Sequence, residues 1–229
     1  MNNAVILLHG ALGSAEQMQP LANLLSAQYQ VFTLNFEGHG GAPLTGEQFA
    51  IPGFANQVHE FIAAQCLEKV NIFGYSMGGY VGLYLAKQYP EKVAKVATFA
   101  TKFRWNPGSA AKEAEMLDAG KIEEKVPQFA RKLQQVHGEQ WKQVLELTAA
   151  MILNLGAQPD LPIEEIANIT VPVLLGLGDS DNMVSLEETG SAYRVLPAGQ
   201  LMVFPNTPHP FEKVNIQRLA TALTDFFGQ

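Results

Sequence analysis

The chain has 229 residues, of which 47% are hydrophobic, and it carries a formal net charge of −7 at pH 7. This length and hydrophobic content predict one large core in a single domain with an insertion, and the acidic charge disfavours a nucleic-acid partner or an anionic membrane surface. A single cysteine excludes an internal disulfide or a cysteine metal cluster, and the short apolar run near the N-terminus is too short for a signal or membrane segment, so we expect a cytoplasmic protein that binds a small molecule.

Short apolar runs alternate with amphipathic stretches along the chain. Nearly continuous hydrophobicity is typical of strands covered by helices on both faces, as in a parallel sheet. The predicted strands cover 4–8, 30–34, 70–74, 94–100, 172–177 and 200–204. The predicted helices cover 17–28, 53–66, 78–89, 186–195 and 213–227. This alternation predicts an α/β fold with a doubly wound, mostly parallel sheet.

One long stretch, 104–168, interrupts the alternation. It has no good strand candidate and is punctuated by Gly120, Gly138 and Gly156. Its helical runs are Ala110–Leu117, Pro127–Val136 and Glu139–Leu155. An insertion of this size between two strands predicts a helical cap on a core domain that comprises 1–103 and 169–229.

The cap carries large apolar side chains that either line a substrate pocket or only pack the cap onto the sheet. These are Trp105, Met116, Phe129, Trp141, Leu145, Met151 and Ile152. We expect Trp105, Trp141 and Met151 to contact substrate.

The segment Gly74-Tyr75-Ser76-Met77-Gly78 has the pattern G-x-S-x-G, and it lies between a β-branched run and a helical stretch. In so tight a turn from strand to helix, the serine backbone is strained and its hydroxyl stands clear of the sheet. The glycines are needed because a Cβ there would clash with the turn or with the neighbouring strand. Ser76 is therefore the predicted nucleophile.

A serine hydroxyl is a weak nucleophile at neutral pH, so this hypothesis requires a base. His209 lies in a proline-stiffened loop between the last predicted strand and the final helix, at the sheet edge where Ser76 also emerges, and it is the predicted base. His9 and His39 follow earlier strands at the same edge, and we expect them to be structural or to line the pocket. His137 carries no catalytic signal.

The base in turn requires a carboxylate that orients its ring. Asp179 and Asp181 both follow the strand predicted at 172–177. We predict Asp181, because it lies further from the strand end and residues 182–184 can anchor the loop behind it. The alternative is that one or both aspartates only cap the following helix.

A glycine-rich turn after the first predicted strand can offer amide N–H groups to a developing oxyanion. Ala11 is the predicted donor, with Leu12 as the alternative, and Met77 supplies the second N–H of the oxyanion hole. We also expect Leu12 to contact substrate. The turn has neither the G-x-x-x-x-G-K-S/T nor the G-x-G-x-x-G spacing, which argues against a nucleotide site.

These segments together resemble the α/β-hydrolase superfamily, in its compact bacterial esterase-like branch. The order Ser76, Asp181, His209 is the superfamily's order. The resemblance rests on His9-Gly10 with its glycine turn, Asn35 to Gly40, Gly74 to Gly79, Gly178 to Val184, and His209. Many relatives have aspartate in place of Asn35. The chain also begins at what resembles the superfamily's third strand, which predicts a six-stranded sheet lacking the first two strands.

The resemblance implies acyl transfer through a Ser-His-Asp triad, with no metal and no organic cofactor. The expected activity is hydrolysis of a carboxylic ester of a small to medium, fairly apolar substrate. Two alternatives stay open: C–C cleavage, elimination or cofactor-free perhydrolysis on the same scaffold, and a binding protein with a vestigial triad. The sequence does not indicate an oligomeric state.

Overall fold

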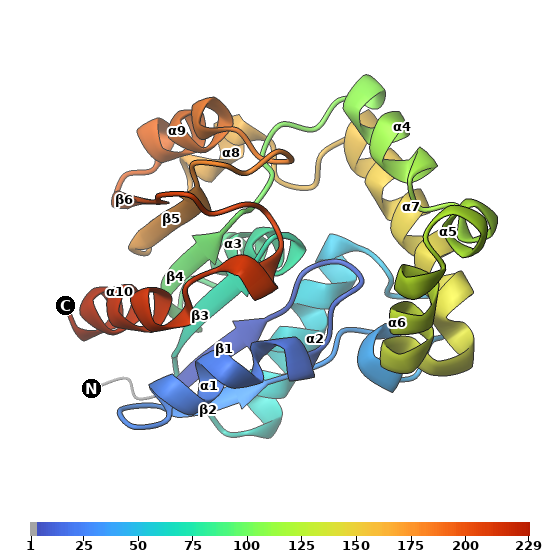
Figure 1. Cartoon of the computed structure of the whole chain (residues 1–229). Helices are drawn as coiled ribbons and strands as arrows, with labels where there is room; N and C mark the ends of the chain where they lie inside the picture. Colours follow the sequence, from blue (N-terminus) through green and yellow to red (C-terminus); the bar gives the residue numbers. More distant parts are fainter. Residues whose placement is uncertain (1–3) are drawn as a thin grey trace.

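The computed structural model describes residues 4–229, so residues 1–3 of the predicted core domain lie outside the described residues. Its six strands are β1 (Ala4–Leu8), β2 (Gln30–Thr33), β3 (Val70–Tyr75), β4 (Val93–Phe99), β5 (Val173–Gly178) and β6 (Gly199–Phe204). They form one sheet in the order β2-β1-β3-β4-β5-β6, and every pair is parallel (Figure 1). The predicted strands are confirmed, and the sheet is parallel throughout rather than mostly parallel.

Helices cover both faces of this sheet. In the core they are α1 (Gln19–Leu25), α2 (Ile51–Ala64), α3 (Met77–Gln88), α8 (Ile163–Ile166), α9 (Leu186–Val195) and α10 (Ile216–Gly228), with short 3-10 helices η1 (Ala15–Met18), η2 (His39–Gly41) and η4 (Phe211–Lys213). Successive strand residues point to opposite faces, so Ile6 and Leu8 pack with α2 and α3, whereas Val5 and Leu7 pack with α1 and α10. This is the doubly wound arrangement that the sequence predicts.

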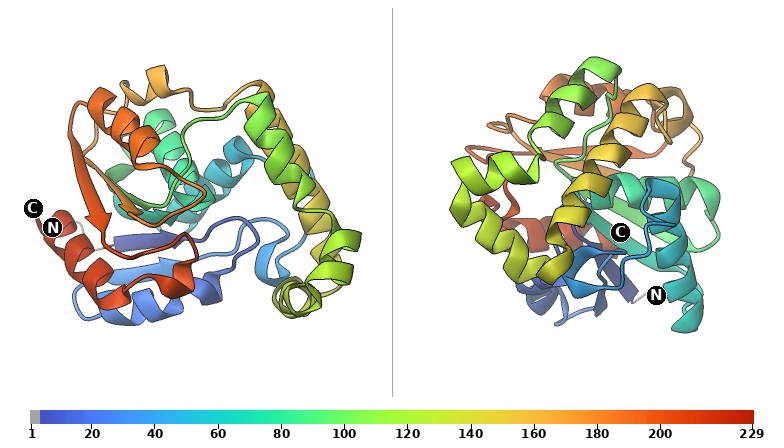
Figure 2. Two further views of the ribbon diagram at one scale, coloured as in Figure 1. Left: turned by 45° about the horizontal axis from the view of Figure 1, so that its top comes forward. Right: turned by 90° about the vertical axis from the view of Figure 1, so that its right-hand side faces the viewer.

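Four of the helices between β4 and β5 lie beside the carboxyl ends of the strands (Figures 1 and 2). They are α4 (Pro107–Glu115), α5 (Ala119–Lys125), α6 (Pro127–His137) and α7 (Trp141–Ala157), with η3 (Gly138–Gln140) before α7. Gly138, at φ +66, ends α6, but Gly120 and Gly156 lie inside α5 and α7 rather than between helices. Within the range 104–168, α8 packs against α9 of the core. The exact domain boundaries stay a prediction.

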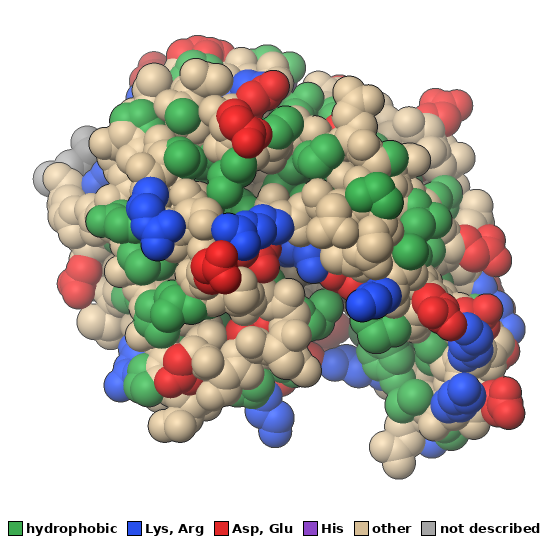
Figure 3. Space-filling view, turned by 90° about the horizontal axis from the view of Figure 1, so that it is seen from above, with side chains coloured by type: hydrophobic (Ala, Val, Ile, Leu, Met, Phe, Trp, Pro, Cys, Tyr) green, Lys and Arg blue, Asp and Glu red, His purple; other side chains and the backbone are tan. Residues whose placement is uncertain are grey.

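Charged side chains of both signs are interspersed over the face of the molecule seen in Figure 3. In the cap and the loop before it, several cationic side chains pair with glutamates: Lys102 with Glu113, Arg104 with Glu187, Lys121 with Glu115, Lys132 with Glu212, and Lys142 with Glu123. These cations are neutralised locally and do not add up to a surface field of one sign. No helix among residues 4–229 is long and apolar enough to cross a membrane.

Candidate active site

Ser76 occupies the turn from β3 into α3. Its backbone, at φ +50 and ψ −115, lies where a residue other than glycine is strained. The end of β4 and the loop after it hold Ser76 there, because the Ser76 amide donates to the carbonyl of Phe99 over 2.8 Å and the Thr101 hydroxyl donates to the Ser76 carbonyl over 2.9 Å. The strain that the sequence pattern predicts is present.

The glycines of the pentapeptide allow this turn to pack closely against β1. A Cβ on Gly74 would lie 2.3 Å from the backbone of Gly78, and a Cβ on Gly78 would lie 2.5 Å from the carbonyl oxygen of Leu8. Both separations are far inside van der Waals contact. The steric reason for the two glycines is therefore confirmed.

His209 and Asp181 are joined by a hydrogen bond of 2.8 Å between Nδ1 and Oδ2. The Asp181 side chain is only 1% exposed, and its Oδ1 accepts the amides of Met183 and Val184, each over 2.8 Å. Burial alone would raise the pKa of Asp181, but the hydrogen bonds from His209 and these amides hold that pKa below its usual value. A carboxylate can only accept, so His209 carries its proton on Nδ1 and leaves Nε2 free to accept one.

Asp179 has different partners. Its Oδ1 accepts a hydrogen bond from the Ser180 hydroxyl over 2.9 Å and one from the Thr207 amide over 3.4 Å. It therefore joins the loop after β5 to the loop after β6, and the carboxylate that contacts His209 is that of Asp181.

A residue that the sequence did not single out holds the His209 loop. The Tyr75 hydroxyl donates to the backbone carbonyl of His209 over 2.9 Å, and the two rings lie 5.6 Å apart. Burial raises the pKa of the Tyr75 phenol, so this donor keeps its proton. Tyr75 is a variable position of G-x-S-x-G, and only the fold brings it next to a residue 134 positions away in sequence.

The turn after β1 and the first turn of α3 approach each other beside Ser76. Gly10 to Gly13 form a tight turn, closed by the Gly13 amide on the Gly10 carbonyl over 3.1 Å. Met77 is the first residue of α3, so its N–H has no acceptor within the helix. Ala11 and Met77 border the same cavity as Ser76, which is where the predicted oxyanion hole requires them.

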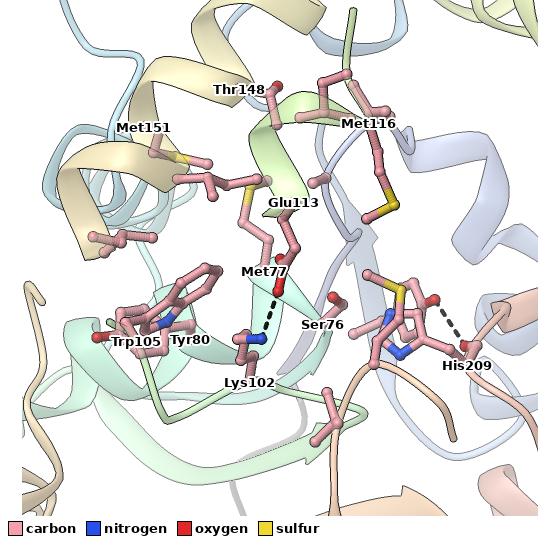
Figure 4. A pocket seen from close by; sticks show the side chains of 18 of the residues that line it. Ser76, Met77, Tyr80, Lys102, Trp105, Glu113, Met116, Thr148, Met151 and His209 are labelled. Carbon is pink, nitrogen blue, oxygen red and sulfur yellow. Dashed lines mark hydrogen bonds and ion pairs between the residues drawn. The ribbon is translucent and has the colours of Figure 1, made fainter. Parts of the chain in front are cut away.

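The cavity beside Ser76 has a volume of about 410 Å³ and a largely apolar lining. In Figure 4, Ser76 and His209 lie on one side of it, and Trp105 and Met151 lie on the other. Met116, Phe129 and Met183 line it but are also exposed to solvent, so they form part of its entrance. Leu12, Trp105 and Met151 thus border the cavity, as expected for contacts with substrate.

Trp141 requires a correction. It does not border this cavity but is buried inside the cap, in a cluster with Ile122, Ala130, Leu133 and Leu145. An aromatic residue at the start of a long helix can either line a pocket or pack inside the cap, and the sequence does not distinguish these two positions. Leu12 packs against this cluster, so Trp141 supports the active-site turn from behind.

One ion pair interrupts the apolar lining. Lys102, in the loop after β4, pairs with Glu113 of α4, and both side chains border the cavity (Figure 4). The Lys102 ammonium also lies 5.3 Å from the centre of the Trp105 ring. Neither charged residue was predicted to border the pocket, because their contact depends on how the cap packs on the core.

Three buried histidines lie behind the turn. The rings of His9 and His39 are 5.0 Å apart, and those of His39 and His137 are 5.6 Å apart. Burial lowers the pKa of all three, to about 4 for His9. Neither His9 nor His39 borders the cavity beside Ser76, which leaves the structural one of their two expected roles. Among residues 4–229, no group of three or more His, Cys, Asp or Glu side chains is arranged to hold a metal ion.

This geometry can be compared with known proteins. The model of the family described as the alpha/beta hydrolase fold matches residues 3–143. The chain belongs to the α/β-hydrolase family. The matched part of this α/β hydrolase contains Ser76 and the turn after β1, whereas Asp181 and His209 lie beyond it.

Curated relatives of this α/β hydrolase match a shorter segment. A pimeloyl-(acyl-carrier protein) methyl ester esterase of Aeromonas hydrophila is 30% identical over 98 residues, which are 42% of this chain and 37% of that protein. A putative carbamate hydrolase, RutD, of Escherichia coli is 32% identical over 90 residues, which are 39% of this chain and 34% of that protein. The matched segments thus span little more than a third of these relatives.

The fold itself matches over the whole chain. The crystal structure of an enol-lactonase from Burkholderia xenovorans LB400 superposes with a TM-score of 0.80 and 18% sequence identity. The superposition covers 100% of this α/β hydrolase and 92% of the lactonase. At this identity the likeness shows the shared fold.

The buried histidines predict that this α/β hydrolase loses stability in mild acid. His9 titrates near 6.5 when unfolded but near 4 when folded, so the unfolded state binds more protons between these values, and stability falls as pH falls through that window. Through His9 alone, a fall from pH 7.5 to pH 5 should lower the free energy of unfolding by about 2 kcal/mol. Urea unfolding at both pH values measures this loss, which should be smaller in His9→Asn. An equal free energy of unfolding at both pH values would contradict it.

Proposed function

We propose that this chain is a serine esterase in which Ser76, His209 and Asp181 act as nucleophile, base and orienting carboxylate. The observation that carries the proposal is the hydrogen bond from His209 Nδ1 to the buried Asp181, beside the cavity that Ser76 also borders. This bond leaves His209 Nε2 as the nitrogen that accepts a proton. The strained backbone of Ser76 and its place at the cavity support its role as nucleophile.

The reaction proceeds in two acyl-transfer steps. His209 Nε2 takes the Ser76 proton as Oγ attacks the substrate carbonyl, and the amides of Ala11 and Met77 stabilise the tetrahedral oxyanion. The imidazolium, stabilised by Asp181, returns the proton to the leaving group, and an acyl-enzyme forms on Ser76. Water then attacks the acyl carbonyl as His209 takes its proton, and His209 returns that proton to Ser76 Oγ as the ester bond breaks and the carboxylic acid leaves.

The substrate is an ester with a small to medium, mainly apolar acyl group. A cavity of about 410 Å³ with a largely apolar lining accommodates such a group. The relatives named as a methyl ester esterase and a carbamate hydrolase act, by those names, on carbonyl groups that carry a heteroatom leaving group. That is the bond that the proposed mechanism cleaves.

Hydrolysis of p-nitrophenyl acetate, butyrate, octanoate and dodecanoate tests the proposal. We expect saturable turnover with a preference along the series, and complete loss of turnover after treatment with a fluorophosphonate. The absence of turnover above the uncatalysed rate across the whole series would contradict an esterase. Turnover that survives complete covalent labelling would contradict the serine mechanism.

Acyl-length preference should depend on the cavity wall. Met151→Ala enlarges the cavity and should shift the preferred p-nitrophenyl ester to a longer chain, changing the ratio of kcat/KM values between neighbouring lengths by about tenfold, as about 1–3 kcal/mol per methylene implies. Trp141→Phe is the matched control, because Trp141 is buried in the cap but does not border the cavity. It should lower thermal stability and leave the preferred length unchanged. The reverse pattern would mean that the wall is built from other residues.

A further inference from the structure

The turn that would bind the oxyanion is itself strained. Leu12, its third residue, has φ +58, a conformation that a branched side chain disfavours. Ala11 precedes Leu12 in the same turn, so the direction of the Ala11 N–H depends on the backbone conformation of this turn. Small rotations of the turn would therefore move the donor away from the oxyanion, unless a contact outside the turn holds it.

The cap supplies that contact. The Leu12 side chain packs against the buried cap cluster that contains Trp141 and Leu145. The Leu12 carbonyl lies 3.1 Å from Nε2 of His137, the last residue of α6. His137 is only 1% exposed, so water does not compete for this hydrogen bond.

The hydrogen bond between His137 and Leu12 is the last of four consecutive hydrogen bonds. They run from Ala15, just after the turn, through Asn35, Gly40 and His137 back to Leu12 in the turn. The Ala15 amide donates to Asn35 Oδ1 over 2.6 Å, and Asn35 Nδ2 donates to the Gly40 carbonyl over 3.2 Å. The Gly40 amide donates to His137 Nδ1 over 3.1 Å, and Nε2 of His137 reaches the Leu12 carbonyl. Thus loops after β1 and β2 and the end of α6 are joined at both sides of the turn.

The partners fix the direction of every link. An amide N–H can only donate and a carbonyl can only accept, so His137 must be neutral with its proton on Nε2. Burial lowers the pKa of His137, which agrees with a neutral ring. Asn35 must both accept and donate. An aspartate carboxylate cannot donate to the Gly40 carbonyl, which gives a physical reason for asparagine in this chain.

We propose that His137 is a positioning residue for the reaction: from the cap, it holds the Leu12 carbonyl and so aims the Ala11 amide at the oxyanion. This inference rests on the proposed esterase mechanism. Through His137, the position of the cap affects stabilisation of the transition state rather than binding of the substrate.

A second cap residue, Gln140, makes it possible to distinguish this role of His137 from simple attachment of the cap to the core. Gln140 Nε2 donates to the carbonyls of Gly38 and Ala42, over 2.9 Å and 2.7 Å. It therefore also ties the cap to the loop after β2, but these bonds do not reach Leu12. Gln140→Ala is the matched control for loss of an attachment without loss of the link to the turn.

The His137 imidazole donates to Leu12 through Nε2 and accepts from Gly40 through Nδ1, and two substitutions test these hydrogen bonds separately. In His137→Gln, the side-chain amide reaches the position of Nε2 and can still donate to Leu12. In His137→Asn, the shorter amide reaches the position of Nδ1 and can serve only Gly40. The measurements are kcat and KM with p-nitrophenyl butyrate, the rate of fluorophosphonate labelling at Ser76, and thermal unfolding.

We expect His137→Asn to lower both kcat and the labelling rate by about tenfold to hundredfold, with KM changed by about twofold at most, since the lost interaction acts in the transition state. His137→Gln and Gln140→Ala should keep kcat within about threefold of the wild-type value. His137→Met has the length of His137→Gln but no donor for the Leu12 carbonyl, so it should lower kcat with KM preserved, and it replaces His137→Asn as the test if that variant does not fold.

Equal kcat values in wild type, His137→Asn and His137→Met would overturn the proposal, as would an equal fall in kcat in His137→Asn, His137→Gln and Gln140→Ala. The second outcome would show that the cap is merely loosened. Absence of hydrolysis and of labelling in the wild type would instead refute the esterase mechanism, so the two failures are distinguishable.

Discussion

Replacing Ser76 by alanine is expected to lower ester hydrolysis by about 10⁵-fold or more, because the oxyanion hole alone retains only a small part of the rate when the nucleophile is missing. The fold should persist, since the backbone hydrogen bonds of residue 76 to Phe99 and Thr101 do not involve the serine hydroxyl. The measurements are kcat/KM with p-nitrophenyl butyrate and thermal unfolding of both proteins.

Ser180→Ala is the matched control. Its hydroxyl lies at the same edge of the sheet, but it donates to Asp179 and not to the proposed triad. This variant should retain wild-type turnover to within about tenfold. Wild-type activity in Ser76→Ala, or loss of activity only in Ser180→Ala, would refute Ser76 as the nucleophile.

The second large effect is expected at Asp181. An asparagine there would donate its amide proton to His209 Nδ1, which moves the imidazole proton to Nε2 and removes the base that Ser76 needs. We expect kcat to fall by about 10⁴-fold at neutral pH. Asp179→Asn changes a carboxylate that bonds Ser180 and Thr207 instead, so its turnover should fall by about tenfold at most.

The measurement is kcat for both variants at neutral pH, with fluorophosphonate labelling as an independent readout of Ser76 reactivity. Asp181→Asn should slow labelling as well as turnover, because both need His209 as a base. If Asp179→Asn were the more damaging change, the roles of the two aspartates would be reversed.

The parts of the site that could be predicted are those that depend on local sequence. G-x-S-x-G indicated the elbow because the two glycines have a steric reason within a few residues of Ser76. The strand pattern brought four loops to one edge of the sheet, since the carboxyl ends of parallel strands meet there. The ranking of Asp181 over Asp179 agrees with the observed contact to His209.

The parts that could not be predicted depend on contacts between distant segments. Tyr75 meets His209 across 134 positions, and His137 meets Leu12 across 125. Nothing near His137 in the sequence indicates this partner. Trp141 was assigned to the pocket wall because hydrophobicity alone does not reveal which side of a cap helix faces the core, and its burial among cap residues corrects that assignment.

Peptide mapping of a fluorophosphonate adduct directly tests whether Ser76 is the nucleophile. Trypsin cleaves after Lys69 and Lys87, and the peptide between them contains Ser76 as its only serine. We expect one adduct per chain by intact mass, located on that peptide, and no adduct in Ser76→Ala. An adduct on any other peptide, or equal labelling of the alanine variant, would contradict it.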